Sequence, residues 1–313
     1  MNLKIGSRGS KLALWQANHI AGLLREQGHS VEIQIIKTTG DRLQEVTFAQ
    51  VGSKGMFTKE IEEALADGSV DLAVHSLKDL PTELPEAFVL AATPRRVDPR
   101  DALLSVRFDS LAALPLGAKV GTSSQRRRAQ LKSLRPDLET VEFRGNVDTR
   151  LKKLIAGQVD AILLASAGLD RLEMAELVRQ RMEPEQICPA AGQGSLGIET
   201  RKGDAATLGA VAFLDDPATR FAITVERAAL AQLGGGCQVP IGIHCRTIGD
   251  AATPTMVEIF GAVAEPESGQ AVRVYHQASI ADADPLALGQ SIARMLIDSG
   301  AGPLLAIPAG GAQ

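Results

Sequence analysis

The sequence DLAVHSLKDLP, residues 71–81, decides the fold. Its first part, residues 71–75, is almost continuously apolar, as expected of a strand that is buried on both faces of a parallel sheet. Residues 57–67 predict a helix before it, and residues 88–92 predict another strand after it. Because strands that alternate with helices indicate a parallel sheet with crossover helices, the chain is predicted to begin with an α/β unit.

The same alternation continues on both sides of this stretch. Toward the N-terminus, strands are predicted at residues 3–7 and 31–37, and Ser10 is the expected N-cap of the helix between them. A second α/β run follows a polar, proline-bounded hinge at residues 93–100. Its predicted elements are strands at 118–121, 140–143 and 160–165, and helices near 123–134, 146–156 and 167–172. Residues 195–199 predict a strand that returns to the first unit, so we expect a cleft between two α/β units.

The rest of the chain predicts a smaller α+β C-terminal domain. The expected elements are a helix at 218–233, strands at 238–246, 256–262 and 272–279, and a last helix at 286–298. We therefore expect three domains, which are residues 1–94 with 195–213, residues 100–188, and residues 217–313.

A cysteine follows three glycines in the sequence GGGCQVP, residues 234–240. Glycine lacks a Cβ and allows close approach of other groups, and Pro240 favours an extended path for the residue before it. Cys237 is therefore predicted to lie on a loop with free space around it, where it could carry a covalently attached group. A small buried side chain beside a glycine helix cap is the alternative.

The composition limits the possible functions. The 313-residue chain has a formal net charge of −4, 45% hydrophobic residues and only 3% aromatic residues. It has no general attraction to nucleic acid, so an anion site must come from a local group of arginines. We expect no signal peptide and no membrane-spanning segment, because no apolar run is long enough. The three cysteines lack metal-binding spacing, so no metal is expected, and they fit reduced thiols in the cytoplasm.

Two arginine-rich segments follow predicted strands and open predicted helices. They are GTSSQRRR, residues 121–128, and FRGNVDTR, residues 143–150. Helix N-termini with free N–H groups, hydroxyls and guanidiniums make anion sites. For either segment alone, a capped helix with solvated charges is the alternative. Both segments lie at the carboxyl ends of strands, where such folds bind ligands, and together they favour a polyanionic ligand.

The polar end of residues 71–81 is a candidate for acid–base chemistry. Asp79 is the candidate acid–base group, with Lys78 as its charge partner. An Asx turn before Pro81 is the alternative. His75 lies inside the apolar run and is predicted to be a satisfied core histidine. The sequence GQGSLG, residues 192–197, matches G-x-G-x-x-G but lacks the strand and helix context of a dinucleotide site.

The chain resembles the porphobilinogen deaminase family, whose members are also called hydroxymethylbilane synthases, over essentially its whole length. The matching segments are SRGSKLALWQ (7–16), VGSKGMF (51–57), DLAVHSLKDLP (71–81), DPRDALLS (98–105), VGTSSQRRRAQL (120–131), EFRGNVDTRLKKL (142–154), DAILLASAGLDRL (160–172), PAAGQGSLGIE (189–199) and GGGCQVPIG (234–242). The resemblance implies a transferase of heme and tetrapyrrole biosynthesis that links four porphobilinogen molecules head to tail. Ammonia leaves at each step, and hydrolysis frees hydroxymethylbilane.

The resemblance also implies the architecture and the partners. Two α/β domains like the type II periplasmic binding proteins should enclose a cleft, beside a smaller α+β C-terminal domain. A dipyrromethane cofactor should be held by a thioether. The family pattern implies a cytoplasmic monomer that binds its small-molecule substrate, porphobilinogen, and neither nucleic acid nor a membrane.

Individual residues take their expected roles from the same resemblance. The thioether falls on Cys237, and the catalytic carboxylate falls on Asp79. The cofactor contacts fall on Ser10, Lys54, Lys78, Thr122, Ser124, Arg126, Arg127, Arg144 and Gly145. The substrate contacts fall on Arg8, Gln16, Arg150, Arg171 and Gln193. Arginine suits a ligand whose pyrrole rings each carry an acetate and a propionate, because guanidinium binds carboxylates in a bidentate manner and stays charged.

Two positions depart from the family pattern. Gln50 stands where many members have a lysine before the V-G-x-K-G motif, which leaves Lys54 to act alone in the long polar segment 38–56. We expect this segment to be a mobile lid, because loops of that length in compact domains are usually functional. Asp148 is expected on a helix surface. A two-domain protein that traps an anionic solute without catalysis is the alternative function, but it gives no purpose to Cys237.

Overall fold

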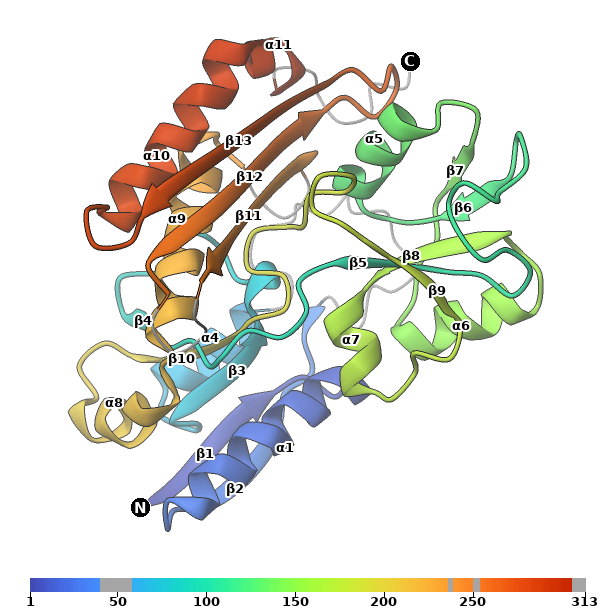
Figure 1. Cartoon of the computed structure of the whole chain (residues 1–313). Coiled ribbons are helices and arrows are strands. Elements are labelled where there is room, and N and C mark those ends of the chain that lie inside the picture. The colour runs from blue at the N-terminus through green and yellow to red at the C-terminus, as the bar shows by residue number, and fades with distance from the viewer. Residues whose placement is uncertain (40–57, 236–238, 250–253, 306–313) are drawn as a thin grey trace. The chain divides into compact units, whose positions relative to one another are not determined.

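The structure is a computed structural model that describes residues 1–39, 58–235, 239–249 and 254–305. The chain forms two compact units, which are Met1–Val97 with Gly194–Arg220 and Asp98–Gln193 with Phe221–Gln313. Figure 1 shows the elements of each unit. The predicted boundaries of three domains and the predicted cleft stay predictions. The predicted lid, residues 38–56, lies almost wholly outside the described residues.

The first unit is built on a five-stranded sheet in the order β2-β1-β3-β10-β4. Its strands are β1 (Asn2–Ser7), β2 (Ser30–Ile35), β3 (Leu72–Ser76), β4 (Phe88–Ala92) and β10 (Leu196–Arg201). Its helices are α1 (Lys11–Glu26), α4 (Lys59–Ala66) and α8 (Ala205–Val211), with the 3₁₀ helices η1 (Leu77–Asp79) and η2 (Ala212–Leu214). The predicted return strand is confirmed as β10, but it runs antiparallel to β3 and β4. The sheet is therefore mixed rather than wholly parallel.

Helix α1 fixes the start of this sheet. Ser10 caps the helix as predicted, since its hydroxyl accepts a hydrogen bond from the backbone N–H of Ala13 at 3.3 Å. Ala17, Ile20 and Leu24 recur at helical spacing and are fully buried in the same core cluster as Ile5 of β1. The N-terminus of α1 is thus held at the edge of the sheet where β1 ends.

The second unit contains another five-stranded sheet, in the order β7-β6-β8-β5-β9. Its strands are β5 (Asp101–Leu104), β6 (Lys119–Gly121), β7 (Glu139–Val141), β8 (Ala161–Ala165) and β9 (Val178–Met182). Its helices are α5 (Gln125–Leu134), α6 (Val147–Ile155) and α7 (Ser166–Arg171). β6 is parallel to β7 and β8, whereas β5 is antiparallel to β8 and β9. The strands β5 and β9 were not predicted from the sequence, because β5 has only four residues and β9 carries two arginines.

The second unit also contains a three-stranded antiparallel sheet, in the order β11-β12-β13. Its strands are β11 (Ile241–Ile248), β12 (Met256–Ala264) and β13 (Ala271–Ser279). Helix α9 (Pro217–Gln232) precedes the sheet, and α10 (Pro285–Leu296), the π-helix η3 (Ile297–Ala301) and α11 (Gly302–Leu305) follow it. One core cluster joins Val225 of α9, Ile259 of β12 and Ile292 of α10.

The predicted fold class is confirmed. The chain is a mixed α/β protein with two larger sheets and a smaller C-terminal sheet that packs on helices. Among the helices of the described ranges, none is both long and apolar enough to cross a membrane.

Candidate active site

The end of β3 turns directly into η1, which carries Asp79. Leu77 and Leu80 anchor this turn, because both side chains are buried and the N–H of Leu77 donates to the carbonyl of Ser195 at 3.0 Å. Asp79 lies between these anchors and is exposed. Within the described parts of the chain, no hydrogen bond or ion pair engages its carboxylate. The structure therefore does not support an Asx turn, and the carboxylate is accessible to a bound molecule.

The predicted site residues of the first unit lie at one edge of its sheet. β1 and β3 are parallel neighbours, with Ile5 opposite Leu72, so the segments after them leave the sheet at the same edge. Gln16 of α1 reaches across, since its Nε2 donates to Oγ of Ser76 at 2.8 Å. This edge gathers Arg8, Ser10, Gln16, Lys78 and Asp79.

His75 is a core residue, as predicted. Its Nε2 lies 2.9 Å from Oε2 of Glu199, and both side chains are buried. The histidine is therefore satisfied by a buried carboxylate inside the sheet.

In the second unit, a buried carboxylate lies between two predicted cofactor-binding arginines. Nη1 of Arg126 is 2.7 Å from Oδ2 of Asp101, and Nη2 of Arg127 is 2.8 Å from Oδ1 of the same side chain. Both arginines lie in the first turn of α5, which is capped by Ser124. Burial by itself raises the pKa of Asp101, but the two guanidiniums outweigh it and hold this pKa well below its usual range. Asp101 was not among the predicted site residues, although it lies in the matching segment DPRDALLS.

Gln193 and Thr122 belong to the same buried region. Nε2 of Gln193 donates to Oδ1 of Asp101 at 2.8 Å and to the carbonyl of Pro99 at 2.7 Å. Thr122 is 1% exposed, and its hydroxyl accepts a hydrogen bond from the N–H of Ser124 at 3.2 Å. The structure therefore brings these predicted contacts together around the N-terminus of α5.

The second arginine-rich segment forms a tight turn before α6. Gly145 has a φ of 119°, and a Cβ at this position would lie 2.9 Å from Cγ2 of Thr149, so only glycine fits without strain. Nε of Arg150 donates to the carbonyl of Gly145 at 2.7 Å, and Nε of Arg144 donates to Oε1 of Glu142 at 2.7 Å. The turn thus holds Arg144 and Arg150 at the N-terminal end of α6.

The electrostatics of these arginines fit an anionic ligand. The pKa of Arg150 is lowered to about 10, first by burial and then by the positive charges of Arg127 and Arg144, against the opposing charge of Glu142. Burial also lowers the pKa of Arg171, at the end of α7, to about 10. Guanidiniums that have lost water and lie near like charges are stabilised by incoming carboxylates. The carboxylates of a dipyrromethane would supply this compensation.

Helix α9 ends just before the predicted cofactor cysteine. The N–H of Gly234 bonds to the carbonyl of Ala231, and the N–H of Gly235 bonds to that of Leu230, which is the Schellman arrangement. Gly234 adopts the left-handed conformation that this arrangement requires, with φ 67°. Cys237 and Lys54 lie outside the described residues. The other two cysteines, Cys188 and Cys245, are buried free thiols.

Two family models match the chain. Residues 3–209 match the model described as porphobilinogen deaminase, dipyromethane cofactor binding domain. Residues 220–298 match the model described as porphobilinogen deaminase, C-terminal domain. The predicted resemblance is therefore confirmed by models that together cover most of the chain.

Curated relatives agree with the family models. The porphobilinogen deaminase of Nitratidesulfovibrio vulgaris strain Miyazaki F is 49% identical over 308 residues, which cover 97% of this chain and 96% of the relative. That of Roseiflexus castenholzii is 48% identical over 307 residues, covering 97% of this chain and 99% of the relative.

Among solved structures, a periplasmic substrate-binding protein of an ABC transporter from Coxiella burnetii is similar, with a TM-score of 0.43 and 18% identity over 70% of this chain and 94% of that chain. The family models and the curated relatives, which span nearly the full length, lead to one conclusion: this chain belongs to the porphobilinogen deaminase family, transferases of tetrapyrrole biosynthesis that carry a dipyrromethane cofactor.

Proposed function

We propose that this chain condenses four porphobilinogen molecules head to tail, with loss of ammonia at each condensation, and releases hydroxymethylbilane by hydrolysis. The observation that carries the proposal is the group of arginines in the second unit. Arg127, Arg144 and Arg150 lie close enough for the charges of the first two to lower the pKa of the third. Holding several guanidiniums close together raises the free energy of the folded protein, and the carboxylates of a growing polypyrrole would offset this rise.

Cys237 would attach the dipyrromethane cofactor through its sulfur. Cys188 is a poor candidate, because burial raises its pKa to about 12 and a thiolate is the reactive form. Cys245 is 1% exposed in the core between the small sheet and its helices. Cys237 comes soon after Gly234 and Gly235, whose backbone N–H groups close the end of α9.

The polar side chains that the family pattern implies would hold the cofactor and the substrate. For the cofactor, we propose Ser10, Lys54, Lys78, Thr122, Ser124, Arg126, Arg127, Arg144 and Gly145. For the substrate, we propose Arg8, Gln16, Arg150, Arg171 and Gln193. Because Arg127 donates to Asp101 and to the carbonyl of Leu163, part of its role would be to orient its neighbours.

Asp79 would act on the substrate. When bound, dipyrromethane supplies the pyrrole ring to which the first substrate is joined. The C–N bond of porphobilinogen breaks with its electron pair leaving on nitrogen, and positive charge develops on the substrate ring. An exposed carboxylate held by the buried anchors Leu77 and Leu80 stabilises this charge and can accept the proton that condensation releases.

Replacement of the carboxylate by an amide tests this role. Asp79→Asn should lower kcat by at least about a hundredfold, because a general acid–base group contributes that much or more. The cofactor mass should be retained. Asp109→Asn, at another exposed aspartate, is the matched control and should keep normal turnover. Near-normal turnover of Asp79→Asn would rule out the assigned role.

We also propose that the protein is a cytoplasmic monomer with three domains. The free thiols Cys188 and Cys245 fit a reducing compartment. Light scattering coupled to size-exclusion chromatography tests the monomer, and a dimer mass would contradict it. The non-catalytic solute-binding protein is not favoured, because family models for a dipyrromethane-binding domain and its C-terminal partner match the chain.

A further inference from the structure

The small sheet of the second unit has one face that does not pack on its helices. Alternate residues of each strand, such as Ile243, Ile259 and Val274, pack in the core cluster with α9 and α10. The residues between them point to the opposite face, because side chains alternate along a strand. Their pairing forms rows across the sheet. One row is His244, Phe260 and Tyr275, and the next is Arg246, Glu258 and Gln277.

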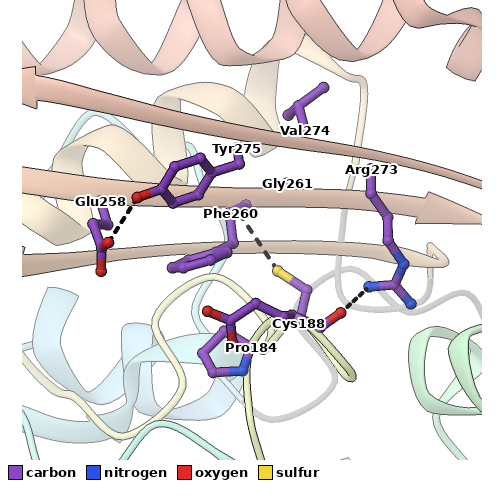
Figure 2. A pocket seen from close by; sticks show the side chains of 9 residues that line it. Pro184, Cys188, Glu258, Phe260, Gly261, Arg273, Val274 and Tyr275 are labelled. Carbon is purple, nitrogen blue, oxygen red and sulfur yellow. Dashed lines mark hydrogen bonds between the residues drawn. The ribbon is translucent and has the colours of Figure 1, made fainter.

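A segment of chain crosses part of this second face. Sγ of Cys188 lies 3.4 Å from the carbonyl oxygen of Phe260. A Cβ at Gly242 would lie 2.5 Å from the carbonyl oxygen of Cys188, so the glycine permits this close approach. The segment from Pro184 to Cys188 leaves a cavity of about 420 Å³ between itself and the sheet (Figure 2). This volume lies within the range of ordinary small-molecule sites.

The sheet side of the cavity is largely aromatic. The rings of Phe260 and Tyr275 have centroids 5.2 Å apart and are tilted by 50°. Phe260 is 6% exposed, whereas Tyr275 is 51% exposed, an unusual exposure for a large ring next to an apolar cavity. The guanidinium of Arg246 lies 5.1 Å from the centroid of the Phe260 ring. A planar ring can stack here and cover the open part of Tyr275.

The charged groups at the cavity differ in whether they have a partner of opposite charge. The carboxylate of Glu258 accepts hydrogen bonds from Tyr275 Oη and Arg246 Nε, each at 2.7 Å, and one from Gln277. Arg273 donates only to neutral oxygens, which are the carbonyls of Glu185 at 3.2 Å and Gln186 at 3.0 Å and the more distant amide of Gln130. Within the described residues, no carboxylate lies within ion-pair distance of Arg273. The carboxylates of Glu258 and Glu185 both lie near Arg246, at 2.7 and 3.8 Å, so in the part of the chain that the structure describes Arg273 lacks a counter-charge of its own.

We propose that this cavity, the β12–β13 pocket, binds a small planar aromatic carboxylate. The ring lies against Phe260 and Tyr275, and the carboxylate is bound by the guanidinium of Arg273. Figure 2 shows Arg273 at one end of the pocket and Glu258 at the other, with the two rings between them. The residues that line this pocket are separate from those assigned to the cofactor and the substrate.

Indole-3-acetate is a suitable probe, because it joins a planar ring to one carboxylate. Its binding to the holoenzyme is measured by calorimetry and by ligand-observed NMR. Arg273→Gln should weaken binding by roughly tenfold or more, as expected for the loss of a charged hydrogen bond. Arg179→Gln is the matched control, because Arg179 lies on β9 and donates to the carbonyl of Ser105 instead. Indole-3-acetamide should bind as weakly to the wild type as indole-3-acetate binds to Arg273→Gln.

A second pair of variants tests the ring contact. Tyr275→Phe keeps the ring and should bind indole-3-acetate within about twofold of the wild type, whereas Tyr275→Ser should lose roughly tenfold. All four variants should keep wild-type turnover of porphobilinogen. The proposal is overturned if the wild type shows no binding up to millimolar indole-3-acetate. It is also overturned if Arg273→Gln binds as the control does, or if the acetamide binds as tightly as the acetate.

Discussion

Arg127 donates two hydrogen bonds to one oxygen of Asp101, from Nη2 at 2.8 Å and from Nε at 3.1 Å, in a part of the second unit from which water is almost excluded. The other oxygen of Asp101 accepts a hydrogen bond from Arg126. One carboxylate thus compensates part of two positive charges. The remaining positive charge belongs to the region where the ligand carboxylates are expected.

Asp101→Asn should destabilise the fold strongly. The substitution leaves two buried guanidiniums without a counter-charge, and breaking a buried pair typically costs about 3–5 kcal/mol. Urea unfolding gives the free energy of unfolding. Asp98→Asn is the control and should cost much less, because Arg100 keeps Glu183 and Arg181 keeps Asp170 as partners. Equal losses of unfolding free energy in the two variants would contradict the role of Asp101 as the counter-charge of two buried arginines.

The lowered pKa of Asp101 predicts that the folded protein loses stability in acid. The pKa of Asp101 is held below its usual range in the folded protein, so its contribution to stability is fully present above the unfolded pKa of about 3.9. That contribution is lost as the pH falls from about 4 toward the folded pKa. The free energy of unfolding should therefore fall more steeply with decreasing pH in the wild type than in Asp101→Asn. Parallel curves between pH 5 and pH 3 would contradict this assignment.

The buried arginines of the proposed ligand site should contribute to substrate binding but not to the stability of the fold. Arg150→Met removes a guanidinium whose pKa is lowered by burial and by its positive neighbours. We expect the free energy of unfolding to be unchanged or higher, while the KM for porphobilinogen rises by roughly tenfold or more. Arg179→Met should change neither quantity by much. A destabilised Arg150→Met enzyme with normal KM would show a structural role instead.

Thiol counting tests whether one cysteine carries the cofactor. Cys188 and Cys245 are buried, and the pKa of Cys188 is raised to about 12 by burial, so neither should react with a thiol reagent at pH 8 in the native protein. The sequence has three cysteines, and a thioether at Cys237 removes one of them. The unfolded holoenzyme should therefore react at two thiols. Reaction at three would mean that no cysteine carries a thioether.

Local features of the fold could be predicted from the sequence. The cap at Ser10, the burial of His75 within an apolar run and the helix before Gly234 could be read from local sequence patterns, and all three were predicted. The antiparallel direction of β10 was not, because strand direction depends on where the chain re-enters the sheet. The short strand β5 was missed, since four residues give too little periodicity.

The candidate site was predicted only in part, for a similar reason. The arginines of residues 121–128 could be recognised from the strand before them and the helix after them. Their partner Asp101 lies 25 residues from Arg126 and 26 residues from Arg127, and such a contact exists only after the sheet has formed. The pocket beside Tyr275 was also missed, because residues from two strands and from the distant segment 184–188 line it.

The intact mass of the purified protein, measured before and after porphobilinogen is added, tests the central proposal most directly. We predict a mass above that of the bare chain by one dipyrromethane, its loss in Cys237→Ser, and stepwise increases of one pyrrole unit after substrate is added to the wild type. A catalytically active protein with the mass of the bare chain, or with an adduct that persists in Cys237→Ser, would contradict the proposal.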